Sequence, residues 1–211
     1  MNLQVYEAII DPSPLSDLEV SFMGMVDRPA IEIKFDVFKE QQAKLNFAIN
    51  DELHIIQGPC MVADLEMYRN DGTLGEYYVK FSAPTIQTIV EKFSAKGYLQ
   101  KFNIMHDPNQ TVEGVTIFNS FITSDKLGIS APKGFEDLSM GSWFISVKID
   151  NPQVWARVKS GEIKGFSVEG IFEYVPAKFI ETPEQSAMRK FYELIGDDMK
   201  AQLIKALNET D

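Results

Sequence analysis

The chain has 211 residues, 45% of them hydrophobic, which is enough for one large domain or one domain with an appendage. A formal net charge of −11, with no apolar run approaching the roughly 18 residues of a membrane span, argues against nucleic acid or a membrane as the main partner. Cys60 is the only cysteine, so no internal disulfide is possible and a reducing compartment fits best.

The first part of the chain is predicted to form strands. Polar and apolar residues alternate over 18–26, 30–35 and 45–49, the pattern of strands with one buried face. Residues 52–68 continue as an extended segment, in which Gly58-Pro59 predicts a bend or bulge.

A hairpin and a helix are predicted next. Asn70-Asp71-Gly72-Thr73 is a strong turn signal, so residues 76–81 should return along the preceding strand. Ser82 is a plausible N-cap, and the apolar spacing that follows it predicts a helix ending at Gly97.

The segment around His106 reads as a strand, and residues 112–123 and 142–149 read as a hairpin-like pair after it. Asp150-Asn151-Pro152 predicts the start of a helix that ends at Ser160-Gly161. A strand over 163–175 then carries Ser167.

The character of the sequence changes after Pro176, where helical spacing of apolar residues predicts a helical tract from about 182 to 207. We therefore expect two parts, a folded domain over 1–176 and a C-terminal helical extension over 177–211. Many short strands with a few flanking helices indicate an α+β fold, mainly an antiparallel β-sheet or barrel.

No cofactor or metal ion is predicted. The chain has no Gly-rich phosphate loop, and its candidate soft ligands, His54, Cys60 and His106, are far apart in sequence and lack motif spacing. A carboxylate-only magnesium or calcium site stays open, although nothing resembles an EF-hand loop. Cys60, between Pro59 and Met61, reads as a small buried hydrophobe, and His54 as a structural residue within a strand.

Two segments about sixty residues apart could supply a nucleophile and its base. One is Asn103-Ile104-Met105-His106-Asp107, and the other is Gly165-Phe166-Ser167-Val168-Glu169-Gly170. A serine hydroxyl becomes a useful nucleophile when a base takes its proton, and imidazole suits that task at neutral pH. Only the fold can bring the two together.

Strand alternation places Ser167, Glu169 and Glu173 on one face of the strand and the aromatic residues on the other. The Ser167 face should therefore meet water, as an incidental outer face, or line a polar site. Gly165 and Gly170 would permit the close approach of another chain or of a substrate backbone.

The chain resembles the phage prohead, or capsid maturation, serine proteases of the XkdF-like type, which are related to the herpesvirus assemblin group. The sequence similarity extends over roughly residues 18–175 and is most specific toward its C-terminal end. It includes Val26-Asp27-Arg28-Pro29, Gln57-Gly58-Pro59-Cys60, the His106 segment, Gly141-Ser142-Trp143 and the stretch from Val154 to Gly170.

This resemblance implies that Ser167 is the nucleophile and His106 the general base. The wider group has a third residue that orients the imidazole; here Glu169 is the first choice, with Glu113 and Asp107 as alternatives, and a Ser–His dyad is also open. Two residues along a strand span about 6.5 Å, so Glu169 would serve only with the imidazole between it and Ser167. Backbone N–H groups near Gly165 or Gly141 could stabilise an oxyanion.

The resulting hypothesis is a serine endopeptidase on a herpesvirus-protease-like fold that cleaves capsid or scaffold precursor proteins in the host cytoplasm, inside the assembling procapsid. By analogy, a homodimer or higher homo-oligomer is expected. One alternative is a non-enzymatic scaffold or structural protein on the same fold. Another is a carboxylate-based hydrolase in which Glu169 and Glu173, about 7 Å apart on one strand, do acid–base work.

Overall fold

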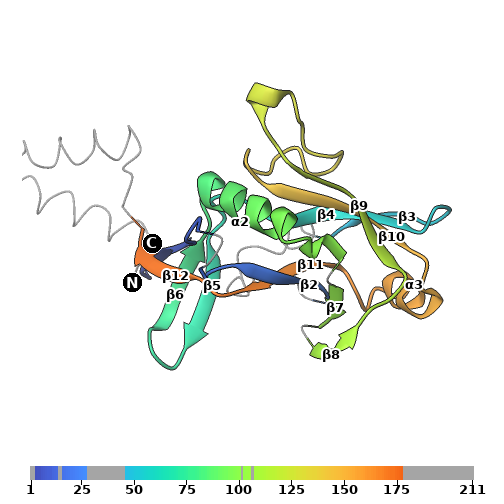
Figure 1. Cartoon of the computed structure of the whole chain (residues 1–211), viewed down its shortest axis with the longest axis horizontal. Coiled ribbons are helices and arrows are strands. Elements are labelled where there is room, and N and C mark those ends of the chain that lie inside the picture. The colour runs from blue at the N-terminus through green and yellow to red at the C-terminus, as the bar shows by residue number, and fades with distance from the viewer. Residues whose placement is uncertain (1–2, 14–15, 28–45, 101, 106, 178–211) are drawn as a thin grey trace, which may run out of the picture. The chain divides into compact units, whose positions relative to one another are not determined.

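The computed structural model describes residues 3–13, 16–27, 46–100, 102–105 and 107–177 (Figure 1). The chain divides into two compact units, Met1–Pro176 and Ala177–Asp211. The predicted strand over 30–35 and the predicted helical tract after 182 lie outside the described residues, so both stay predictions.

The described part of the first unit contains three four-stranded sheets. The first sheet has the order β12 (Glu173–Pro176), β1 (Val5–Ile9), β6 (Gly75–Lys80), β5 (Met67–Asp71). The second has the order β3 (Ala48–Asn50), β4 (Ile55–Met61), β10 (Trp143–Ile149), β9 (Val115–Ile122). The third has the order β11 (Gly165–Gly170), β2 (Val20–Val26), β7 (Phe102–Ile104), β8 (Asp107–Thr111).

Most strand pairs are antiparallel, as predicted; the parallel ones are β1 with β6 and β2 with β7. Together with the flanking helices this confirms a mixed, mainly β, α+β fold. Each sheet of the described ranges has two open edges, so the barrel form of the prediction is not found there.

Both predicted hairpin pairings are confirmed. β5 and β6 pair across the turn after Asp71, and β9 pairs with β10. The predicted bulge also lies where expected, because the register between β4 and β10 shifts at Pro59 and Met61, beside Cys60. Pro59 lacks an N–H, and a bulge is a position where a strand tolerates that loss.

Both predicted helices are confirmed. Helix α2 (Ala83–Ala95) begins after Ser82 and ends before Gly97, whose φ of 69° suits glycine. Helix α3 (Pro152–Lys159) is capped by the Asn151 side chain, which accepts from the backbone N–H groups of residues 153 and 154 at 3.0 and 3.1 Å. Two short 3-10 helices, η1 (Tyr98–Gln100) and η2 (Asp125–Leu127), complete the described elements.

The strand predicted over 163–175 is wrong as one element, since it is divided into β11 and β12, which belong to different sheets. The division follows from a close backbone approach. A Cβ on Gly170 would lie 2.4 Å from the Glu19 carbonyl oxygen, and the Ile171 N–H donates to that same oxygen at 2.9 Å. The absence of a side chain at Gly170 therefore lets the backbone at Glu19 come close. After Gly170 the chain leaves the third sheet and continues to β12 in the first.

All three sheets and both helices contribute to one hydrophobic core. Alternate residues of β10 from Trp143 to Ile149 are fully buried. Phe144, on the opposite face of β10, is buried too, because Phe135 and Phe121 pack against it with ring centroids 5.6 and 5.7 Å away. A strand covered on both faces needs apolar residues on both.

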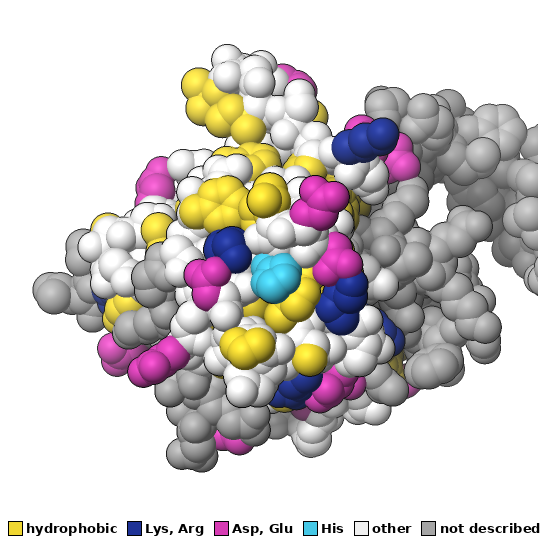
Figure 2. All heavy atoms as spheres, turned by 90° about the vertical axis from the view of Figure 1, so that its right-hand side faces the viewer, with side chains coloured by type: hydrophobic (Ala, Val, Ile, Leu, Met, Phe, Trp, Pro, Cys, Tyr) yellow, Lys and Arg dark blue, Asp and Glu magenta, His cyan; other side chains and the backbone are white. Residues whose placement is uncertain are grey.

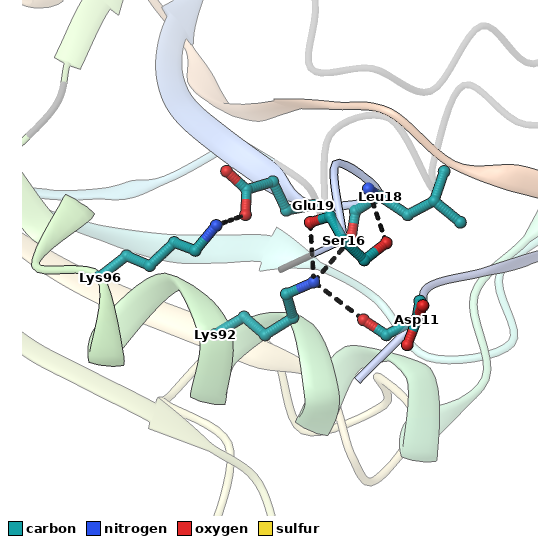
Figure 3. A network of polar contacts seen from close by, with 6 residues as sticks. All are labelled: Asp11, Ser16, Leu18, Glu19, Lys92 and Lys96. Atoms are coloured by element: carbon teal, nitrogen blue, oxygen red, sulfur yellow. Dashed lines mark hydrogen bonds and ion pairs between the residues drawn. The ribbon is translucent and has the colours of Figure 1, made fainter. Parts of the chain in front are cut away.

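Hydrogen bonds from a buried lysine connect α2 to the segment before β2 (Figure 3). The Lys92 ammonium donates to the carbonyl oxygens of Asp11, Leu18 and Ser16 at 2.8, 3.0 and 3.4 Å. Only 8% of Lys92 is exposed, so these carbonyls replace most of its hydration. One turn along the helix, Lys96 forms an ion pair with Glu19.

Tyr77 on β6 gives the fold a predicted alkaline sensitivity. Its hydroxyl donates to Asp71 Oδ2 at 2.7 Å, and burial followed by this hydrogen bond raises its pKa from 10.0 to about 12. The folded state therefore keeps a proton that the unfolded chain releases above pH 10. We expect the free energy of unfolding to fall by about 1 kcal/mol per pH unit between pH 10 and 12 from this group.

Urea unfolding of the wild type and of Tyr77→Phe across this pH range checks the effect. The phenylalanine variant should be less stable below pH 10, and the difference should shrink as the pH rises. An unchanged difference at pH 12 would contradict the assignment.

Candidate functional site

Ser167 lies in the middle of β11, and its neighbours across the third sheet are fixed by register. Ser167 pairs with Gly24 on β2, and Gly24 pairs with Asn103 on β7. Laterally paired residues point to the same face of a sheet, so Ser167 and Asn103 share a face on either side of a glycine. No side chain at position 24 separates them. We call Ser167, Gly24 and Asn103 the polar row.

The Ser167 side chain is not on a solvated face, and that part of the prediction is wrong. Only 1% of Ser167 is exposed, and Phe166 on the other face is 2% exposed. The third sheet is thus covered on both sides at this point. Ser167 Oγ has no hydrogen-bond partner among the described residues, an unusual state for a buried hydroxyl.

Glu169 shares the Ser167 face of β11, as predicted. It also has a hydrogen-bond partner, Asn103, that was not predicted from the sequence. Asn103 Nδ2 donates a short hydrogen bond to Glu169 Oε1. Asn103 is 1% exposed, and its Oδ1 has no partner among the described residues. The signal in the sequence was a polar residue between Phe102 and Ile104 in a strand buried throughout.

His106, the predicted general base, lies outside the described residues. The residues on either side of it are described. Met105 follows the last residue of β7, has a φ of 54°, and its N–H donates to the Met25 carbonyl oxygen at 3.1 Å; Asp107 begins β8. β7 is two strands from β11, so the backbones of Asn103 and Ser167 are separated by about 10 Å.

The other candidates occupy different places. Asp107 pairs with Ile104 in the β7–β8 hairpin. Glu113 is exposed, and its carbonyl oxygen accepts from the Asn151 side chain at the start of α3. Glu173 is on β12, in another sheet from Glu169, so the continuous strand that would have placed these two carboxylates about 7 Å apart is absent.

The Gly141 N–H cannot serve as the proposed oxyanion donor in this form. It donates to the backbone and side-chain oxygens of Thr123, at 3.0 and 3.1 Å. A Cβ at Gly141 would lie 2.3 Å from Ala83 Cβ, so this glycine is used for packing against α2. Gly165 pairs with Val26 at the start of β11. The backbone N–H groups near it remain a prediction for the oxyanion donors.

His54 lies in a turn before β4, not within a strand, and it stacks on Trp155 of α3 with ring centroids 4.5 Å apart. Nearby, Lys159 pairs with Asp51, and this hydrogen bond lowers the pKa of the Asp51 carboxyl. Figure 2 shows the face that carries the histidine, with acidic and basic side chains around it. The stacking on Trp155 gives His54 a structural contact, in keeping with the prediction that it is a structural residue.

An apolar pocket lies on the other face of β11 from Ser167. Phe166 and Val168 line it together with Pro59, Cys60, Met61, Val62, Leu65, Met67, Arg69, Val79, Phe81, Phe172 and Tyr174. Burial raises the pKa of the Cys60 thiol well above its usual value, so it stays protonated at neutral pH and is a poor nucleophile. No group of three or more potential metal ligands occurs among the described residues.

In the described residues the geometry thus defines three open sheets, with a buried serine and asparagine beside a half-buried carboxylate on the third. Residues 49–176 match the family model described as "Putative phage serine protease XkdF", more than half of the 211-residue chain. The chain therefore belongs to this phage serine protease family.

The match contains both His106 and Ser167 but begins after residues 18–48, so the similarity noted in that part of the sequence is not covered by it. Neither the curated proteins nor the solved structures gave a match. In the part of the chain that the structure describes, no helix is long and apolar enough to cross a membrane.

Proposed function

We propose that this protein is a serine endopeptidase that cleaves scaffold or capsid precursor proteins during phage head maturation. Ser167 is the nucleophile, His106 the general base and Glu169 the carboxylate that supports the base. Membership of the phage serine protease family carries the proposal. A buried serine hydroxyl that has no partner among the described residues, on one face with a carboxylate, supports it from the geometry.

The chemistry follows the general scheme of acyl transfer. Ser167 Oγ attacks the peptide carbonyl carbon while His106 takes the hydroxyl proton, and the imidazolium returns that proton to the leaving amine. Water, deprotonated by the same imidazole, then attacks the acyl carbon, and the imidazolium returns its proton to Ser167 Oγ as the acyl group leaves as a carboxylic acid. A carboxylate beside the imidazole stabilises its charged form, and that is the role proposed for Glu169.

The burial of Ser167 adds a condition. A hydroxyl that is 1% exposed can meet a peptide bond only after the residues that cover it move. We therefore propose that the described form is a closed one and that substrate engagement opens the site. Such gating would limit cleavage to the assembling shell, where substrates are concentrated.

The setting follows from the same proposal. The enzyme acts in the host cytoplasm, inside the assembling procapsid, with precursor proteins as its substrates, and it works as a homodimer or higher homo-oligomer without a cofactor. A fold related to the herpesvirus proteases belongs to the proposal as well.

One observation favours the non-enzymatic alternative, a scaffold or structural role. The same burial of Ser167 is what a hydroxyl without catalytic duty in a packed sheet would show. The two functions differ in the reactivity of Ser167, because a side chain without a base reacts no faster than free serine.

Reaction with a small alkyl fluorophosphonate in the presence of the capsid and scaffold precursor proteins, which are proposed to open the site, tests the proposal. The modified residue is mapped by mass spectrometry. We expect the wild type to be modified at Ser167 and His106→Ala to react at least about a hundredfold more slowly, since a general base contributes roughly 10²–10⁴. His54→Ala is the matched control and should react like the wild type. Absence of modification at Ser167 in the wild type over hours, with the precursor proteins present, would overturn the protease assignment in favour of the scaffold role.

A further inference from the structure

We infer that Asn103 is the positioning residue of this site, holding the Glu169 carboxylate on the Ser167 side of the sheet. The inference rests on the proposed function of Ser167. Asn103 starts from β7 and Glu169 from β11, with β2 between them. The hydrogen bond from Asn103 Nδ2 to Glu169 Oε1 therefore spans the width of β2 on the face of the polar row.

The crossing is diagonal, because Asn103 pairs with Gly24 whereas Glu169 pairs with Phe22 on β2, and Gly24 leaves the Asn103 end of this path without a side chain. Gly24 lies directly between Ser167 and Asn103 in the register, where any other residue would project a side chain onto the same face. The orientation of the amide is set by chemistry, because an ionised carboxylate only accepts hydrogen bonds and so must face the NH₂ group. Asn103 Oδ1 is thereby left pointing away from Glu169, as a buried acceptor without a partner among the described residues.

Two unpartnered buried atoms distinguish the polar row from an ordinary structural link. Asn103 Oδ1 and Ser167 Oγ both lack partners among the described residues, although each residue is only 1% exposed. Leaving a buried polar atom unsatisfied destabilises the folded state. An asparagine needed only to tie β7 to β11 would gain stability by satisfying its oxygen. We attribute the unsatisfied oxygen, on the same row as the proposed nucleophile, to a role in function.

Exchange of the two polar side chains separates positioning from simple linkage. Asn103→Asp places two carboxylates against each other and removes the donor. Glu169→Gln keeps the hydrogen bond but removes the charge. The double variant Asn103→Asp/Glu169→Gln restores the bond with the polarity reversed and moves the carboxylate from β11 to β7. Asn119→Asp, an exposed position on β9, controls for the added charge.

The readouts are the rate of Ser167 modification by the alkyl fluorophosphonate and the midpoint of thermal unfolding, measured on the full chain. We expect Asn103→Asp to lower both, the rate by at least about tenfold. The double variant should recover the unfolding midpoint but not the rate, because the carboxylate then extends from β7 and no longer from position 169 on β11, where the proposal places the group that supports the base. Asn119→Asp should match the wild type in both.

Two results would overturn the inference while leaving the protease assignment intact: a wild-type rate in Asn103→Asp, or a double variant that regains the rate together with the midpoint. If Asn103→Asp does not fold, the double variant still decides. A wild type that is not modified at Ser167 is a different result, which overturns the protease assignment and this inference with it.

Discussion

Ser167→Ala is expected to abolish cleavage of the head precursor proteins while the protein stays folded. The alanine variant has no hydroxyl to attack the peptide carbonyl, and loss of a catalytic nucleophile leaves only the residual effect of substrate binding, several orders of magnitude below the wild type. Co-expression with the capsid and scaffold precursors of the phage, followed by mass analysis of the products, measures this effect.

The stability of the same variant should hardly change, and this is what makes the experiment informative. Ser167 Oγ has no partner among the described residues, so its removal breaks no hydrogen bond and relieves a desolvated polar atom. Ser146, an equally buried serine on β10, is the matched control, because its Oγ accepts from Gln57 Nε2 at 2.7 Å. Ser146→Ala should lose stability and keep cleavage. Intact cleavage in Ser167→Ala would refute the nucleophile assignment.

Of the substitutions proposed for this protein, Lys92→Met is expected to lower the free energy of unfolding the most. The methionine side chain keeps most of the apolar contact with α2 but leaves the carbonyl oxygens of Asp11, Ser16 and Leu18 without their donor. Hydrogen bonds to a charged group contribute roughly 1.5–3 kcal/mol each, and they are not additive here because one ammonium makes all three. We expect a loss of about 3 kcal/mol, or about 6–12 °C in the unfolding midpoint for a domain of this size.

Differential scanning calorimetry measures this loss, and Lys96→Met is its control. Lys96 pairs with Glu19 at a more exposed position, where solvent screens the ion pair, so that variant should lose much less. Equal midpoints for the two variants would show that the carbonyl cluster around Lys92 does not hold the segment before β2.

Local patterns in the sequence were sufficient for most of the elements. The turn after Asp71, the Asn151 cap of α3 and the bulge beside Cys60 were all predictable, because each depends on the conformational preferences of a few neighbouring residues. β1 was not predicted at all: its residues, Val5–Ile9, show no alternation of burial, since four of the five are half-buried. Its pairing with β6 and β12 depends on residues about 70 and 170 positions away.

The candidate site shows the same limit. The sequence determined which residues could act, since a serine, a carboxylate and a histidine stand in two segments typical of a phage protease family. It also placed Ser167 and Glu169 on one face of β11, because side chains alternate along a strand.

Only the tertiary structure decided what surrounds that face. The register of β2 between β7 and β11 put a glycine between Ser167 and Asn103, joined Asn103 to Glu169, and buried a hydroxyl that alternation alone had assigned to a polar face. The close approach of Glu19 to Gly170 separated Glu173 from that site. Strand register and the covering of a sheet depend on contacts between distant segments, and no local pattern of residues encodes them.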